Sequence, residues 1–186
     1  MKDRLSESLD KPVLATITDT LISEYLTLEL ADVACVHRCS VDEVLGDVLG
    51  IDAVVVDLGT FTADEEASSK SLEDWLDVLG SVAGRRPVLV LLPADMEADP
   101  WLATHADIVR VDRRKFARPA RSEAPQVAEG DADCSKELLN TLAQVRRWFE
   151  QREEEIQVRL LQRLLVEVAQ VFQTAAAAPE DKGEKQ

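Results

Sequence analysis

Five short apolar runs, separated by amphipathic or polar stretches, constrain the fold of this chain more than any other feature. The runs occupy residues 12–17, 33–36, 53–56, 87–92 and 107–111. Residues 53–56 and 87–92 are continuously apolar, as strands covered on both faces are. Strands that alternate with helices form parallel sheets, because each crossover returns the chain to the same edge. The pattern therefore predicts an α/β fold with a five-stranded, doubly wound parallel sheet.

Capping signals mark the ends of the helices between these strands. Residues 18–20, Thr-Asp-Thr, precede an amphipathic stripe and can cap it, and Asp99 followed by a proline has the pattern of an N-cap before proline at the first helical position. Ser40 and Glu43 have the spacing of a capping box, in which each side chain accepts a backbone N–H of the other residue. Gly50 is expected to end the helix that Ser40 opens.

Charge excludes some classes of partner. The chain has 36 acidic and 21 basic residues and a formal net charge of −15. Such a charge repels phosphate backbones, so nucleic acid is not an expected partner. Since no apolar run approaches the ~18 residues that a bilayer requires, no membrane span is expected. The polar first residues lack an apolar secretion core, which predicts a cytoplasmic protein.

One basic strip interrupts the acidic sequence directly after the fifth apolar run. The interpretation that we favour is a solvated loop that offsets nearby acids. The alternative is a docking strip for an acidic partner or for nucleic acid. Its basic residues are Arg110, Arg113, Arg114, Lys115, Arg118 and Arg121.

The last third of the chain predicts a linker and a long amphipathic helix. Residues 117–133 contain two prolines and an acidic Gly-containing stretch, as flexible linkers do. Residues 134–178 repeat apolar side chains at steps of three and four; we expect 134–150 to dock on the sheet and 156–175 to pair with another chain. Residues 179–186 are an expected disordered tail. The association residues are Leu160, Leu161, Leu164, Leu165, Val168, Val171 and Phe172.

The three cysteines form no disulfide framework, because their number is odd. Cys35, His37 and Cys39 have a spacing within the range of zinc-binding pairs, but no second Cys/His pair follows them. We therefore interpret them as small strand residues.

Three segments in order resemble the receiver domain of two-component response regulators, over about residues 10–116. Residues 50–58, Gly-Ile-Asp-Ala-Val-Val-Val-Asp-Leu, look like the family's third strand, which ends on the phosphate-accepting aspartate. Residues 87–91 look like its fourth strand, and residues 114–116 are similar to the end of its fifth. The resemblance implies that Asp57 is the phosphoacceptor and that Asp19 and Asp57 help to hold Mg²⁺, a hard cation that takes oxygen ligands.

The sequence departs from the family at the other positions that phosphorylation requires. Thr18 stands where a second acid would help to bind the cation, and Leu92 stands at the position of the hydroxyl that senses the phosphate. The lysine position falls at Asp112, or at Arg114 if the loop is longer. The resemblance is therefore to a degenerate, or pseudo-receiver, domain. The family's route from phosphorylation to movement is incomplete here.

Three interpretations of Asp57 remain open. The first is a strand-end acid that caps or solvates a loop, the second is a phosphoacceptor, and the third is a cation ligand together with Asp19. The first is favoured, and no cofactor is expected beyond weak Mg²⁺ binding in the third.

These observations favour a non-catalytic signalling or scaffold protein that acts through protein–protein contacts. Its partner at the C-terminal helix would be a second copy, giving a homodimer, or another helical protein. The alternative is a phosphorylatable response regulator with Asp57 as acceptor. An enzyme on a doubly wound fold is disfavoured, because the sequence shows no nucleophile–base pair, glycine-rich phosphate loop or metal cluster.

Overall fold

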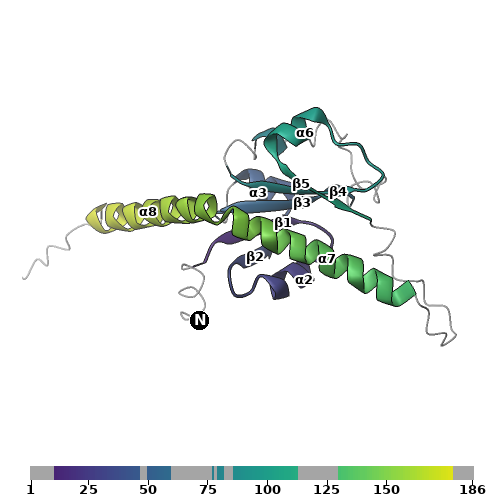
Figure 1. Ribbon diagram of the computed structural model, residues 1–186. Helices are drawn as coiled ribbons and strands as arrows, with labels where there is room; N and C mark the ends of the chain where they lie inside the picture. Colours follow the sequence, from purple (N-terminus) through teal and green to yellow (C-terminus); the bar gives the residue numbers. More distant parts are fainter. Residues whose placement is uncertain are drawn as a thin grey trace, which may run out of the picture.

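The computed structural model describes residues 11–46, 50–59, 77, 79–81, 86–112 and 130–177. The predicted parallel sheet is confirmed (Figure 1), with the strand order β2-β1-β3-β4-β5 of flavodoxin-like folds. All four strand pairs are parallel. The strands are β1 (Val13–Ile17), β2 (Cys35–Arg38), β3 (Ala53–Asp57), β4 (Val88–Pro93) and β5 (Asp107–Val111).

The second strand begins two residues later than the sequence predicts. The N–H groups of Val33 and Ala34 both donate to the carbonyl of Leu30, at 3.0 and 2.9 Å, and so extend the turn that follows the preceding helix. The chain first pairs with β1 at Cys35, which lies opposite Val13. The apolar run at 33–36 therefore includes two residues of a helix-terminating turn.

Helices cover both faces of the sheet (Figure 1). α2 (Thr20–Glu29) and α7 (Gly130–Gln151) contribute to the hydrophobic cluster on one face. α3 (Val41–Gly46) and α6 (Pro100–His105) contribute to the cluster on the other face. The sheet is thus the middle layer of three, as its continuously apolar central strands require.

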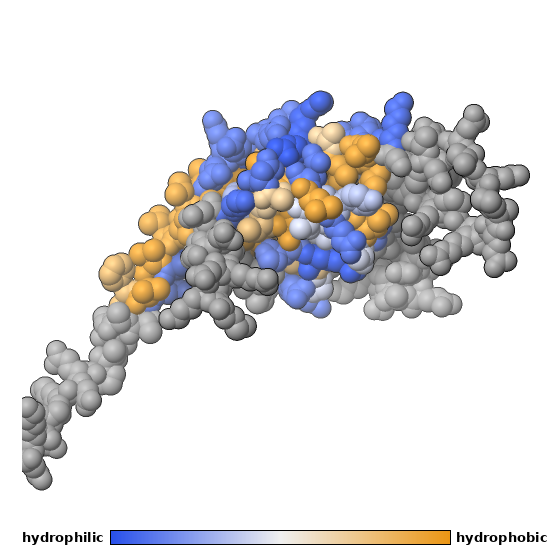
Figure 2. Space-filling model, turned by 90° about the horizontal axis from the view of Figure 1, so that it is seen from below, coloured by the Kyte–Doolittle hydropathy of each residue, from blue (hydrophilic) through white to orange (hydrophobic). Residues whose placement is uncertain are grey.

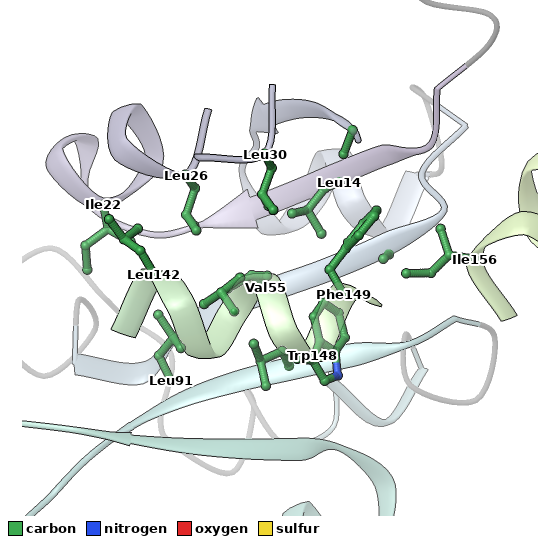
Figure 3. Packing of buried hydrophobic residues seen from close by; sticks show 14 of the residues in the cluster. Leu14, Ile22, Leu26, Leu30, Val55, Leu91, Leu142, Trp148, Phe149 and Ile156 are labelled. Atoms are coloured by element: carbon green, nitrogen blue, oxygen red, sulfur yellow. The ribbon is translucent and has the colours of Figure 1, made fainter. Parts of the chain in front are cut away.

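Alternate residues of β3 enter opposite halves of the core. Val54 and Val56 belong to the cluster beneath α3 and α6, whereas Val55 belongs to the cluster beneath α2 and α7. In the second cluster, Trp148 and Phe149 of α7 cover the sheet (Figure 3). All five residues of β3 are buried, so this strand is the centre of the domain.

The predicted N-caps are confirmed. Asp19 accepts the N–H of Ile22 at 2.9 Å at the start of α2, and Asp99 accepts the N–H of Trp101 at 2.7 Å at the start of α6. Before α3, the Ser40 N–H donates to Glu43 at 2.6 Å, and the Glu43 N–H donates to Ser40 Oγ at 3.3 Å. These bonds satisfy backbone donors that the first helical turn leaves unpaired.

Removal of the Ser40 hydroxyl is expected to lower the free energy of unfolding by about 0.5–2 kcal/mol, because one N-terminal donor of α3 loses its acceptor. Urea denaturation of Ser40→Ala measures this change. Ser40→Thr keeps a capping oxygen and is the matched control, with an expected stability close to that of the unmodified chain. Equal losses in the two variants would show that the hydroxyl does not stabilise α3.

The predicted helix over 134–178 is two helices. α7 begins at Gly130, inside the predicted linker, and α8 spans Glu153–Ala177. The interruption is at Arg152, whose N–H is shared between the carbonyls of Trp148 and Phe149, at 3.0 and 3.2 Å. This sharing tightens the last turn of α7, and the chain changes direction there (Figure 1).

α8 lies partly against the domain and partly beyond it (Figure 1). Ile156 belongs to the cluster beneath α7, and Leu160 is only 5% exposed. The later turns extend away from the sheet. Across the described parts of the chain, no helix has both the length and the apolar character needed to cross a bilayer.

Candidate functional site

The carboxyl edge of the sheet brings together the positions that the sequence analysis selected. The register pairs Ile17 with Val56, so that Thr18 and Asp57 occupy neighbouring positions where β1 and β3 end. Asp57 in turn pairs with Leu91, and Leu92 is the next residue of β4. In sheets of this kind, the carboxyl ends of the strands are where ligands bind.

The carboxylates of Asp19 and Asp57, at this edge, both accept hydrogen bonds from backbone N–H groups close to them in sequence. Asp57 is 2% exposed, and its Oδ1 accepts the N–H of Gly59 at 2.9 Å, which caps the helical residues Leu58 and Gly59 that follow β3. Asp19 Oδ1 accepts the N–H of Ile22 and caps α2. Such contacts are the ones that a loop-capping role for Asp57 requires.

The two positions beside Asp57 that carry functional groups in receivers are occupied here by Thr18 and Leu92, neither of which is ionisable. Thr18 is buried, and its hydroxyl donates to the backbone carbonyl of Asp19 at 3.1 Å. Leu92 is buried in the core cluster beneath α6, so the position of the family's hydroxyl is part of the hydrophobic core. Within the described residues, no group of three or more His, Cys, Asp or Glu side chains is arranged to hold a metal ion.

Of the basic strip, the structure describes one residue. Arg110 in β5 donates to the backbone carbonyl of Met96 at 3.0 Å and so fixes the loop after β4. The other five basic residues, Arg113, Arg114, Lys115, Arg118 and Arg121, lie outside the described residues.

Neither Cys35 in β2 nor Cys39 directly after it lies in a group of side chains that could hold a metal ion, among the residues that the structure describes. Cys35 is half-buried, Cys39 is buried, and His37 between them is exposed. Burial raises the pKa of the Cys39 thiol, and the nearby Glu43 carboxylate raises this pKa further. A raised pKa lowers the fraction of thiolate, which is the form that attacks electrophiles and binds metals.

The amino edge of the sheet has a buried ion pair that the sequence analysis did not find. Asp52, directly before β3, accepts the N–H of Val13 at 2.8 Å and Nη2 of Arg163 at 3.1 Å. The same Nη2 lies 3.4 Å from the carbonyl oxygen of Lys11. The Asp52 side chain is 2% exposed and that of Arg163 is 14% exposed. This contact fastens α8 to the starts of β1 and β3.

Gly50 makes room for that contact. It has a φ of +59°, and a Cβ placed on it would collide with Cδ of Arg163. Glycine is therefore required twice: for the left-handed backbone and for the passage of the arginine side chain. From the sequence, Gly50 is expected to end the helix that Ser40 opens, whereas α3 spans Val41–Gly46. The close approach of Arg163 to Gly50 has no local signal in the sequence.

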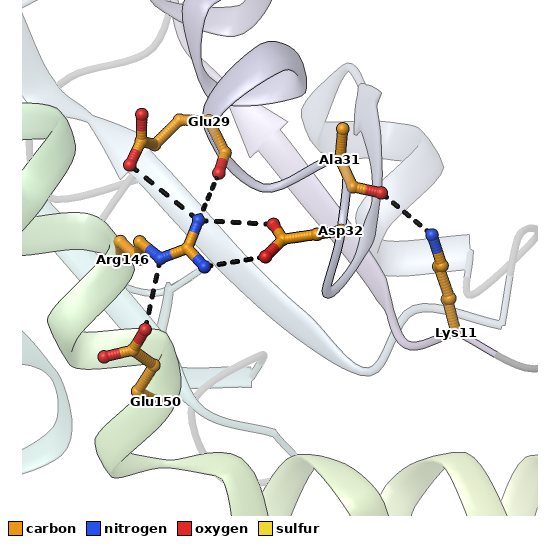
Figure 4. Close-up of polar contacts among 6 residues, drawn as sticks. All are labelled: Lys11, Glu29, Ala31, Asp32, Arg146 and Glu150. Atoms are coloured by element: carbon orange, nitrogen blue, oxygen red, sulfur yellow. Dashed lines mark hydrogen bonds and ion pairs between the residues drawn. The ribbon is translucent and has the colours of Figure 1, made fainter.

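A second arginine fastens α7 to the end of α2 (Figure 4). Arg146 donates to the Glu29 carbonyl at 2.7 Å and to both carboxylate oxygens of Asp32, at 3.2 and 2.7 Å. It also bonds Glu150 at 3.1 Å. The hydrogen bond from Arg146 lowers the pKa of Asp32. A cation at this point also complements the negative end of the α2 dipole.

A third arginine fixes the junction between α7 and α8. Asp107 at the start of β5 accepts two hydrogen bonds from Arg152, each at 2.9 Å, and one from Nε1 of Trp148 at 2.7 Å. Partial burial raises the pKa of Asp107, but the bonds from Arg152 and Trp148 outweigh it, and the net pKa lies below the usual value. Asp107 at the start of β5 thus fixes Arg152, the residue at which the chain turns from α7 into α8.

Two clefts flank α8 at this edge, with volumes of about 730 and 520 Å³. Both are lined by Arg86, Arg159 and Gln162. Carboxylates alternate with these arginines, among them Asp107 in the larger cleft and Asp52 in the smaller. The mixture of signs gives neither cleft the uniform charge that would select an ion.

The remaining candidate is the exposed surface of α8, where Figure 2 shows a run of hydrophobic side chains. Leu165 and Phe172 are 70% and 71% exposed. Of the residues selected from the sequence, Leu161, Val168 and Val171 are also exposed, Leu164 is half-buried, and Leu160 lies against the chain's own domain.

No family model matches the chain, and no curated protein matches it.

Proposed function

We propose that the chain is a non-catalytic, cytoplasmic signalling or scaffold protein that acts through protein–protein contacts of a pseudo-receiver domain and its C-terminal helix. The observation that carries this proposal is the exposed apolar surface of α8. A contiguous apolar surface of this kind is a mark of an interaction site on a protein.

The domain supports this proposal through the use that it makes of its aspartates. Asp57 caps the helical residues that follow β3, Asp19 caps α2, and Leu92 is a core residue. These side chains have structural tasks at an edge where a working receiver concentrates its phosphorylation chemistry. The resemblance to receivers in strand order and in residues 50–58, together with these structural roles, supports a receiver-like domain that is used for protein contacts.

The alternative is a phosphorylatable response regulator with Asp57 as acceptor. The observation in its favour is the position of Asp57, at the carboxyl end of the central strand and next to Thr18 in register. Against it stand the burial of Asp57 and the replacement of the phosphate-sensing hydroxyl by Leu92.

Incubation with acetyl phosphate and Mg²⁺ separates the two proposals. We expect the intact mass to stay unchanged, because Asp57 is buried, Thr18 stands at the position of the second acid that helps to hold the cation, and Leu92 stands at the position of the phosphate-sensing hydroxyl. Asp57→Ala is the control for labelling elsewhere. Stoichiometric gain of one phosphoryl group in the unmodified chain, lost in Asp57→Ala, would contradict the proposal and establish the alternative.

A further inference from the structure

The exposed apolar residues of α8 follow a heptad. Val158, Leu161, Leu165, Val168 and Phe172 are each more than half exposed, and their spacing is three, four, three and four. These are the a and d positions of a coiled coil, which form a single stripe when two helices wind around each other. We call these five residues the α8 seam.

The opposite side of α8 is the side that contacts the domain. Ile156 and Leu160 are buried there, Arg163 bonds Asp52, and Glu167 lies 3.4 Å from Arg163. In the heptad these four residues occupy f and c positions, which a coiled coil turns away from its partner. A second helix can therefore lie along the α8 seam without displacing the contacts that hold α8 to its own domain.

The residues beside the seam are uncharged. Gln162 and Ala169 occupy e positions, and Leu164 and Val171 occupy g positions. Charges at e and g set the choice and orientation of the partner helix, through interhelical salt bridges or through repulsion between like charges. Uncharged flanks impose no such selection, so that two copies can approach despite a net charge of −15 on each.

The size of the seam also suits a second copy. Five large apolar side chains with more than half of each surface exposed amount to on the order of 600 Å² per chain, near the ~800 Å² per partner of a standard interface. Leu164 and Val171 add to this area at the flanks. We propose that two copies of this chain pair through their α8 seams in an antiparallel dimer, which deepens the proposed function and rests on it.

The antiparallel direction follows from where the domain lies on α8. The first turns of the helix lie against the domain, and the later turns extend beyond it (Figure 1). A parallel pair would bring two strongly acidic domains together at one end, whereas an antiparallel pair puts them at opposite ends. Charges farther apart than the Debye length, about 8 Å at physiological ionic strength, are largely screened from each other.

In the antiparallel dimer, each a position of one copy lies opposite a d position of the other, and these pairs form the layers of the interface. Leu165 lies against Val168 of the second copy, and Leu161 lies against Phe172 of the second copy. A large side chain thus faces a smaller one in each layer. A parallel pair would instead stack Phe172 on Phe172.

Sedimentation equilibrium of the full chain tests the pairing. We expect a dimer, and we expect Leu165→Glu to give a monomer, because it introduces two carboxylates at the centre of the seam. Val166→Glu is the matched control: Val166 is 57% exposed and adjacent in sequence but lies at a b position, so this variant is expected to remain a dimer. Circular dichroism checks that both variants keep their helices.

A monomeric full chain at high micromolar concentration would overturn the proposal, as would a trimer, a tetramer, or equal dissociation of both variants. None of these outcomes changes the mass after acetyl phosphate treatment, so a failed dimer and a failed function are distinguishable.

Disulfide trapping in a chain without its native cysteines tests the direction. We expect a mixture of Leu161→Cys and Phe172→Cys chains to form a disulfide between the two variants, and neither variant to form one alone. In a parallel pair, positions 161 and 172 are offset by about 16 Å along the axis, beyond the ~7 Å Cα separation that a disulfide spans. Efficient homodimeric disulfides of Leu161→Cys would overturn the antiparallel arrangement.

Discussion

Val55→Asp is expected to leave the chain unfolded at 25 °C. Val55 is 0% exposed in the middle of β3, and its cluster includes Leu14, Leu91 and Phe149. A carboxylate there meets neither water nor a cation, so that its charge must be neutralised or the strand expelled. The penalty of several kcal/mol for an unpaired buried ion is comparable with the ~5–15 kcal/mol that stabilises a typical domain.

Thermal unfolding followed by circular dichroism measures this effect. Leu139→Asp is the control, because Leu139 is an exposed residue of α7 and a surface substitution changes stability by about 0.5 kcal/mol or less. Persistence of the cooperative transition of the unmodified chain in Val55→Asp would show that residues 53–57 are not the central strand.

Arg163→Met is expected to cost about 3–5 kcal/mol and to release α8 from the domain, because it leaves the buried Asp52 carboxylate without its cation. Methionine keeps most of the apolar stem that lies over Gly50 and removes the guanidinium alone. Chemical denaturation gives the loss of stability, and hydrogen exchange of the α8 amides shows whether the helix detaches.

Arg159→Met is the matched control for this substitution. Arg159 lies one turn earlier on α8 and makes no ion pair with the residues that the structure describes. Its loss is therefore expected to change stability little. Equal effects of the two substitutions would show that the Asp52–Arg163 pair does not anchor the helix.

Features set by neighbouring residues could be predicted from the sequence. The buried strands follow from their continuous apolar runs, and the caps at Asp19, Ser40 and Asp99 follow from spacings of two or three residues. The strand order also agrees with the family resemblance. The edge strand β2 begins two residues later than predicted, because the first two residues of the apolar run belong to a turn. Hydrophobicity alone does not distinguish that turn from a strand.

Features set by distant residues could not be predicted. The junction at Arg152 depends on Asp107, and the amino-edge anchor joins Asp52 to Arg163, which is 111 residues later. The two sides of α8 are a further example. Leu160 and Leu161 are equally apolar, but adjacent residues point about 100° apart on a helix. Only the position of the domain shows that Leu160 is covered and that Leu161 is exposed.

The contribution of α7 and α8 to the core has a consequence for synthesis on the ribosome. The last strand ends at Val111, but α2 covers only part of the apolar face around Leu14 and Val55, and the rest is covered when Phe149 and Ile156 have been added. Those 45 residues from Val111 to Ile156 take about 2–9 s at ~5–20 residues per second. During that interval the nascent sheet presents one incompletely covered face to chaperones and to neighbouring nascent chains, so the last third of the chain sets the time at which the first third can finish folding.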